Sequence, residues 1–117
     1  MIHHNAVQIV QPDLFYYGGF IRAIRVARMA AQANMTCTPH ISGSTLGYLY
    51  VLHFASCVPN AGKHMEYKGK KDKIPFTCAT SSLDLTEEGT IAVPSGPGLG
   101  IVIDPEYIQD AEQVTQS

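Results

Sequence analysis

Hydrophobic and polar positions form short extended runs that alternate with longer helical stripes. Residues 6–11 are a β-branched run, which Pro12 ends because proline cannot continue a central strand. Residues 20–33 carry apolar side chains at a spacing of three to four residues, which predicts a helix, and Asn34 is a plausible stop for it. The solvent-facing side of this helix is predicted to hold Arg22, Arg25 and Arg28.

The same order of strand, loop and helix then repeats. Residues 35–39 predict a second strand that ends at His40, and a polar loop containing glycine leads to a helix over residues 46–57. This helix is apolar nearly all round, so we expect it to be buried on more than one side. A third, short strand is predicted at residues 64–67.

The remainder of the chain has a different character. Residues 74–85 read as irregular, and residues 87–89 predict a turn. Asp104 and Pro105 predict the cap and first turn of a short last helix. We therefore expect two regions: residues 1–73, with the strands and long helices, and residues 74–117, a tail with a β-hairpin-like segment and a short helix.

Composition narrows the functional classes. A chain of 117 residues with 45% hydrophobic and 15% charged side chains is typical of one globular domain. The formal net charge of −2 creates no basic field, so neither nucleic acid nor a membrane is an expected partner. No run is long enough to span a bilayer, and the polar amino end does not resemble a signal peptide, which predicts a cytoplasmic protein.

The three cysteines, which are Cys37, Cys57 and Cys78, are widely spaced and form no CxxC pair. This spacing disfavours a zinc site and a disulfide framework, and it favours a reducing compartment. A small-ligand or metal-binding module built on these cysteines and nearby histidines is one functional hypothesis, although no spacing supports it. The basic loop that contains Lys68, Lys70, Lys71 and Lys73 could attract an acidic ligand, but a solvated loop is the favoured prediction.

Three side chains with catalytic potential follow the three predicted strands. Asp13, His40 and Glu66 lie at or just beyond a strand's carboxyl end, with separations of 27 and 26 residues. One strand-loop-helix-loop unit of a parallel barrel takes about 30 residues, so we expect the three side chains at the same end of neighbouring parallel strands. Because imidazole titrates near neutrality, His40 is suited to act as a proton-transfer base.

Each of these residues also has a structural interpretation. Asp13, following Pro12, could be only a turn residue. His40 could be a structural hydrogen-bonding group, and Glu66 a solvated acid at a strand end. The shared spacing and the flanking motifs together favour the catalytic interpretation of all three.

A set of short motifs occurs in order over nearly the whole chain. They are Val10-Gln11-Pro12-Asp13, Gly18-Gly19, Pro39-His40 with Ser42-Gly43-Ser44, Pro59-Asn60, Glu66-Tyr67, and Pro94-Ser95-Gly96-Pro97-Gly98-Leu99-Gly100. As a set they resemble the carboxyl-terminal part of the enolase superfamily, in its mandelate racemase/muconate lactonising enzyme branch. The resemblance implies the α/β class and a partial (β/α)8 TIM barrel, made of strands six to eight with their helices. The tail would then pack on a capping domain that this chain lacks.

The resemblance also implies a reaction, which is abstraction of a proton next to a carboxylate to give an enediolate. Asp13 and His40 match an Asp–His dyad, in which Asp13 would orient the ring, fix its tautomer and raise its basicity. Glu66 matches an acid that hydrogen-bonds the substrate's carboxylate or enolate. If its neighbours held Glu66 protonated, it could donate a hydrogen bond to the developing oxyanion.

The family's Mg²⁺ is implied as well, but the acidic residues that hold it lie on strands that this chain does not contain. We therefore predict a carboxyl-terminal fragment of a Mg-dependent acid-sugar dehydratase-like enzyme, acting on a sugar acid or other carboxylate, with unknown substrate-binding residues. The alternatives are a catalytically silent truncated fragment and a racemase or cycloisomerase. Three parallel strands taken from a barrel expose two unpaired edges, which predicts self-association or pairing with a complementary chain.

Overall fold

A computed structural model describes residues 1–4, 6–43, 45–68 and 74–111. The chain divides into two compact units, residues 1–71 and residues 72–117. Most of the predicted basic loop lies outside the described residues, of which Lys68 is the last before the gap.

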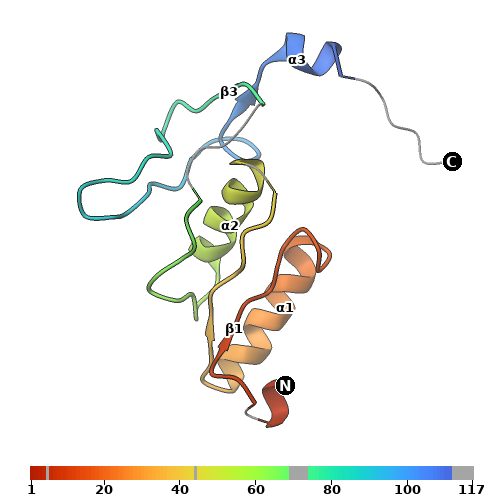
Figure 1. The fold of residues 1–117 in the computed structure, drawn as a ribbon, viewed down its shortest axis with the longest axis vertical. Coiled ribbons are helices and arrows are strands. Elements are labelled where there is room, and N and C mark those ends of the chain that lie inside the picture. Colours follow the sequence, from red (N-terminus) through yellow and green to blue (C-terminus); the bar gives the residue numbers. More distant parts are fainter. Residues whose placement is uncertain (5, 44, 69–73, 112–117) are drawn as a thin grey trace, which may run out of the picture. The chain divides into compact units, whose positions relative to one another are not determined.

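A parallel pair of short strands organises the first unit. After a single 3-10 turn at Ile2–His4, β1 (Ile9–Val10) lies beside β2 (Thr36–Cys37), and helix α1 (Gly19–Gln32) connects them (Figure 1). Both strands are shorter than the predicted runs. The register pairs Ile9 with Thr36 and Val10 with Cys37, and an isolated parallel bridge then pairs Asp13 with His40. Because the offset of 27 residues is the same at all three pairs, the two segments stay in register up to their carboxyl ends.

The third extended segment pairs earlier in the chain than the sequence predicts. An isolated parallel bridge joins Cys37 to Ala61, with hydrogen bonds from Cys37 N to Asn60 O (2.9 Å) and from Gly62 N to Cys37 O (3.0 Å). No strand is assigned at residues 64–67, so that prediction is wrong. The segment that neighbours β2 is the backbone at residues 60–62.

Asn60 explains why pairing occurs there. Its side-chain Nδ2 donates to Ala27 O (3.0 Å) and to Met35 O (2.9 Å), so one amide joins the segment to α1 and to the entrance of β2. Hydrogen bonds of this kind fix a backbone position that the hydrophobic pattern does not specify. The chain leaves the pairing after Gly62 and continues towards Glu66 without a regular ladder.

Helix α1 buries a narrow stripe of small side chains, Ala23, Ala27 and Ala30. The helix ends as predicted, because Asn34 follows it in the left-handed conformation with φ of 55°. The predicted solvent side is also confirmed, since Arg22, Arg25 and Arg28 are all exposed.

Helix α2 (Thr45–Cys57) confirms the prediction of burial on more than one side. Its buried residues are Thr45, Gly47, Tyr48, Leu49, Val51 and Phe54. Aromatic contacts join it to α1, because the Phe20 ring lies 5.9 Å from that of Tyr50 and 6.4 Å from that of Phe54, measured between centroids. Edge-on pairs of this kind add to the burial of their surface.

The second unit contains an antiparallel pair, β3 (Phe76–Thr77) with β4 (Val102–Ile103), followed by helix α3 (Pro105–Gln109). The prediction of irregular structure over residues 74–85 is therefore wrong at β3. The cap of α3 is confirmed, because the Asp104 carboxylate accepts a hydrogen bond from Glu106 N at 2.9 Å. The predicted turn is also present, with Gly89 N donating to Thr86 O at 3.0 Å.

A close approach between α2 and the preceding loop gives the first prediction. A Cβ at Gly47 would lie 2.0 Å from Ser42 O, so Gly47→Ala should destabilise the chain by about 1–3 kcal/mol. Alanine in place of a helical glycine otherwise stabilises by about 1 kcal/mol, so the sign of the change is diagnostic. Urea unfolding would measure it, with exposed Ser56→Ala on the same helix as a control expected within about 0.5 kcal/mol of wild type. Equal or greater stability of Gly47→Ala would show that the loop and the helix are not in contact.

Candidate active site

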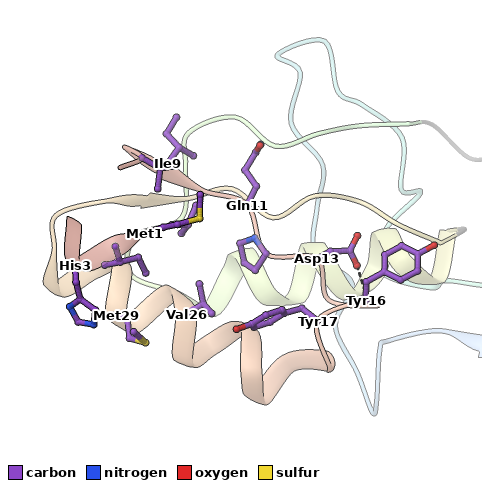
Figure 2. Close-up of a pocket in the computed structure, with 13 residues that line it drawn as sticks. Met1, His3, Ile9, Gln11, Asp13, Tyr16, Tyr17, Val26 and Met29 are labelled. Carbon is purple, nitrogen blue, oxygen red and sulfur yellow. Dashed lines mark hydrogen bonds between the residues drawn. The ribbon is translucent and has the colours of Figure 1, made fainter. Parts of the chain in front are cut away.

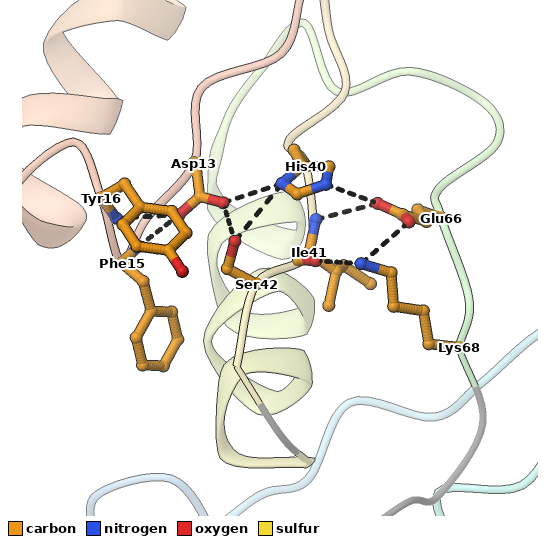
Figure 3. Close-up of polar contacts among 8 residues, drawn as sticks. All are labelled: Asp13, Phe15, Tyr16, His40, Ile41, Ser42, Glu66 and Lys68. Carbon is orange, nitrogen blue, oxygen red and sulfur yellow. Dashed lines mark hydrogen bonds and ion pairs between the residues drawn. The ribbon is translucent and has the colours of Figure 1, made fainter.

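Asp13 and His40 meet at the carboxyl ends of β1 and β2. His40 Nδ1 lies 2.8 Å from Asp13 Oδ2, at hydrogen-bonding distance (Figure 3). The Asp13 side chain is only 14% exposed, whereas that of His40 is 51% exposed. The imidazole is therefore held on one side by a largely buried carboxylate and is open to solvent elsewhere.

Asp13 is at the same time a turn residue. Its Oδ1 accepts hydrogen bonds from Phe15 N at 2.8 Å and from Tyr16 N at 2.9 Å. Its Oδ2 accepts a hydrogen bond from Ser42 Oγ as well as facing His40. The two interpretations of Asp13 drawn from the sequence are thus compatible, because the turn contacts aim the second oxygen at the ring.

These contacts determine the charge of Asp13. Partial burial by itself would raise the pKa of the carboxyl group. Hydrogen bonds from Ser42, from His40 and from the backbone N–H groups of Tyr16 and Phe15 outweigh it and lower the pKa from 3.8 to about 2. Asp13 is therefore ionised and can only accept, which places a proton on His40 Nδ1 and leaves the lone pair on Nε2.

Glu66 lies on the other side of the ring. Its Oε2 accepts a hydrogen bond from Ile41 N at 2.9 Å and lies 3.9 Å from His40 Nε2. Its Oε1 lies 3.2 Å from Lys68 Nζ, and the same ammonium donates to Ile41 O. The three residues singled out in the sequence are therefore close together, with an acid facing each nitrogen of the imidazole (Figure 3).

The neighbours of Glu66 keep it ionised. The hydrogen bond from Ile41 N lowers its pKa, partial burial opposes this, and the Lys68 ammonium and His40 lower it further. The idea that Glu66 is held protonated and donates a hydrogen bond is thus wrong for this structure. An ionised Glu66 offers only acceptor atoms.

Two residues at the site were not singled out in the sequence for a role there. Ser42 belongs to one of the motifs, but the sequence predicts no role for it, and a solvated loop is the favoured prediction for Lys68. A signal for Lys68 did exist, since residues two apart on an extended chain share a face and Glu66 was already a candidate. Ser42 is two residues after His40, but loop geometry rather than periodicity directs its hydroxyl.

A separate pocket opens beside β1 and α1, with a volume of about 560 Å³ (Figure 2). It is lined by Met1, Ile2, His3, Val7, Ile9, Val10, Gln11, Pro12, Asp13, Tyr16, Tyr17, Val26 and Met29. His40 and Glu66 do not line it, and most of its lining is apolar. Such a surface suits another apolar surface better than a charged, hydroxyl-rich ligand.

The acids of the site do not suit a divalent metal ion. Both oxygens of Asp13 and both of Glu66 already accept hydrogen bonds or face cations. Among the residues that the structure describes, no group of three or more His, Cys, Asp or Glu side chains is arranged to hold a metal. Cys37 is no better as a ligand, because burial raises the pKa of its thiol to about 11.

The described helices can be compared with the length and apolar character that a membrane span needs. None of them combines the length and the apolar character that crossing a bilayer requires.

Comparison with known proteins identifies relatives of this chain. The sequence profile described as "Enolase C-terminal domain-like" matches residues 1–107. The arabinonate dehydratase of Saccharolobus solfataricus is 29% identical over 88% of this chain, and the D-galactarolactone cycloisomerase of Agrobacterium fabrum is 28% identical over 91% of it. A crystal structure of a protein from Roseobacter denitrificans superimposes with a TM-score of 0.81 and 34% identity, covering 96% of this chain.

The chain covers less than a third of the length of each of these relatives. The chain spans 27% of the arabinonate dehydratase, 30% of the cycloisomerase and 31% of the Roseobacter protein. The fold is mixed α/β and consistent with part of a TIM barrel.

The lowered pKa of Asp13 predicts how the stability of the chain depends on pH. A depressed pKa contributes stability above 3.8, and this contribution is lost as the pH falls through about 2. The stability advantage of wild type over Asp13→Asn should therefore be largest above that range and should shrink as the pH approaches 2. Urea unfolding at a series of pH values would measure it, with exposed Asp110→Asn as the control for removing one carboxylate. An advantage that stays constant down to pH 2 would contradict the assigned contacts.

Proposed function

The chain belongs to the enolase C-terminal domain-like family, in the mandelate racemase/muconate lactonising enzyme branch of the enolase superfamily, and on that basis we propose that it supplies the proton-abstracting part of an enzyme acting on a sugar acid. The observation that carries the proposal is the contact of His40 Nδ1 with an ionised Asp13 at the ends of two parallel strands. In this proposal β1 and β2 correspond to barrel strands six and seven, and residues 60–62 to strand eight.

His40 acts as the base through Nε2. Because Asp13 accepts the Nδ1 proton, the ring is held in one tautomer and one orientation, and Nε2 can take a proton from the carbon next to the substrate's carboxylate. General-base catalysis by a positioned side chain contributes about 10²–10⁴-fold to a rate. After transfer, each ring nitrogen carries a proton and faces a carboxylate oxygen, at 2.8 Å for Asp13 and 3.9 Å for Glu66.

Glu66 and Lys68 form the side of the site that meets the substrate's carboxylate. Glu66 alone would repel such a group, because it is ionised. The Lys68 ammonium at 3.2 Å balances that charge, and two of its three N–H groups face Glu66 and Ile41 O. The remaining N–H can be donated to a carboxylate oxygen.

Membership of the superfamily implies Mg²⁺, which stabilises the enediolate when bound. The described acids do not fit that ion, as shown above, and the steps assigned to this chain use only its own side chains. Any stabilisation by metal would rely on ligands beyond the described residues.

Among the reactions of this family, dehydration is the one we propose. Relatives of the chain include an arabinonate dehydratase, two D-galactonate dehydratases from Xanthomonas species and a D-xylonate dehydratase from Haloferax volcanii. A racemase or cycloisomerase is the alternative, since all three reactions begin with the same proton abstraction and a relative is a D-galactarolactone cycloisomerase.

Proton abstraction can be tested without knowing which product forms. The chain is incubated in D₂O with Mg²⁺ and a panel of sugar acids, and deuterium at carbon 2 and 2-keto product are followed by NMR. We expect exchange by wild type and a rate at least about 100-fold lower for His40→Asn. Exchange that survives His40→Asn would show that the base is wrongly assigned. Equal absence of exchange from wild type and variant would favour the catalytically silent fragment.

A second proposal concerns association between two copies of the chain. Among the described residues, β1 pairs with β2 on one side and with no strand on the other. Ile9 on this strand is 53% exposed and lines the apolar pocket. An unpaired edge beside an apolar pocket favours pairing with another chain.

Light scattering would test this association. We expect wild type to be larger than a monomer, and Ile9→Lys to shift it towards the monomer because a charged side chain protects an exposed edge. Val102→Lys changes a strand residue that is 65% exposed in the other unit, so it is the matched control and should leave the mass unchanged. A monodisperse wild-type monomer would contradict the proposal.

A further inference from the structure

Ser42 is placed to act on both members of the Asp13–His40 pair. Its Oγ donates a hydrogen bond to Asp13 Oδ2, the same oxygen that faces the ring, and lies 3.4 Å from His40 Nδ1 (Figure 3). Ser42 is partly buried, two residues beyond His40. No other side-chain hydroxyl is shown bonded to Asp13 in the described part of the chain.

Ser42 supplies one of the four hydrogen-bond partners of the Asp13 carboxylate. A carboxylate has about four lone-pair positions. Two backbone N–H groups fill those of Oδ1, and Ser42 Oγ and His40 Nδ1 fill those of Oδ2. Removing the hydroxyl would leave His40 Nδ1 as the one remaining partner of Oδ2 and weaken the hold on that oxygen, although the turn contacts to Oδ1 would stay.

The loop after His40 contains a glycine at a position with positive φ, and it passes close to Phe15 and to α2. Gly43 adopts φ of 78°, and a Cβ there would lie 3.1 Å from the Phe15 ring. Gly47 lets Ser42 O approach α2, as described above. Because Phe15 also donates its N–H to Asp13, one residue contacts both the carboxylate and the loop that carries Ser42. The loop that carries Ser42 therefore has little room for a side chain at Gly43 or Gly47.

The hydroxyl also favours one tautomer of the ring. Its single proton is donated to Asp13, so the Ser42 oxygen can only accept from His40 Nδ1. The groups facing Nδ1 are then two acceptors, Asp13 Oδ2 and Ser42 Oγ. Two acceptors favour a proton on Nδ1 and a lone pair on Nε2.

We propose that Ser42 is a positioning residue that holds Asp13 Oδ2 against His40 Nδ1 and thereby keeps the basic lone pair on Nε2. Its consequence for turnover rests on the proposed function, whereas its effects on the aspartate and on the tautomer do not. By analogy with the groups that orient metal-binding histidines, we expect the loss of Ser42 Oγ to cost about 10–100-fold in activity.

The test compares isotope-labelled wild type with Ser42→Ala, Ser42→Thr and Ser56→Ala by NMR. The Asp13 carboxyl carbon reports its pKa, and the two ring nitrogens of His40 report the tautomer. For Ser42→Ala we expect the pKa of Asp13 to rise from about 2 towards 3.8 and the tautomer with the proton on Nε2 to gain population. Ser42→Thr keeps the hydroxyl and should resemble wild type. Ser56→Ala removes an exposed hydroxyl that donates to His53 O and should change neither reading.

Unchanged Asp13 pKa and tautomer in Ser42→Ala would overturn the proposal. If that variant does not fold, Ser42→Cys preserves the shape with a weaker donor, and the same two readings decide. Deuterium exchange at carbon 2 separates this proposal from the proposed function. Shifted NMR readings with a 10–100-fold slower exchange support both. Shifted readings without any exchange in wild type support the positioning role and contradict the enzymatic one.

Discussion

The contact between the Asp13 carboxylate and the His40 imidazole depends on two chain segments that run parallel and in register. The offset of 27 residues at Ile9–Thr36 is still present at Asp13–His40, so no bulge intervenes between the strands and the site. Each residue of a strand advances the chain by about 3.3 Å, and a slip of one residue turns a side chain to the opposite face. Such a slip would break the 2.8 Å contact between His40 Nδ1 and Asp13 Oδ2. The contact therefore depends on the register of β1 and β2, which helix α1 connects.

Glu66 reaches the ring by a different route. The bridge between Cys37 and Ala61 has an offset of 24 residues, so continuing that register would place residue 64 beside His40. Glu66 lies two residues beyond this position, and its carboxylate reaches back to Ile41 N. Ile41 N donates to Glu66 and Ile41 O accepts from Lys68, so the backbone of one residue positions both members of the ion pair. The acid that faces Nε2 is thus anchored to the strand that carries the histidine.

Periodicity and chain spacing predict the two long helices and the grouping of the three candidate side chains. Both long helices lie within a residue of their predicted bounds, and Asp13, His40 and Glu66 lie together. The sequence does not predict the features that depend on residues distant in the chain. The pairing of β3 with β4 joins residues 25 and 27 apart, and the Asn60 amide rather than strand propensity fixes residues 60–62. The lowered pKa of Glu66 likewise depends first on Ile41 N, which lies 25 residues earlier in the chain and which no local pattern connects to Glu66.

The roles of the side chains at the site follow from which of their atoms already have hydrogen-bond or ion-pair partners. The oxygens of Asp13 are committed to the turn, to Ser42 and to the ring, and those of Glu66 to Ile41 N and Lys68. Within the described part of the chain, His40 Nε2 is the exception, because the acceptor that faces it, on Glu66, lies 3.9 Å away, beyond hydrogen-bonding distance. On the proposed function this nitrogen takes the proton, and the Lys68 ammonium is the group beside Glu66 that can offset the charge left on the substrate, since carboxylates cannot stabilise an enediolate. On the same proposal, removing the proton is the task of His40, which Asp13 orients, and stabilising the resulting anion requires cationic groups.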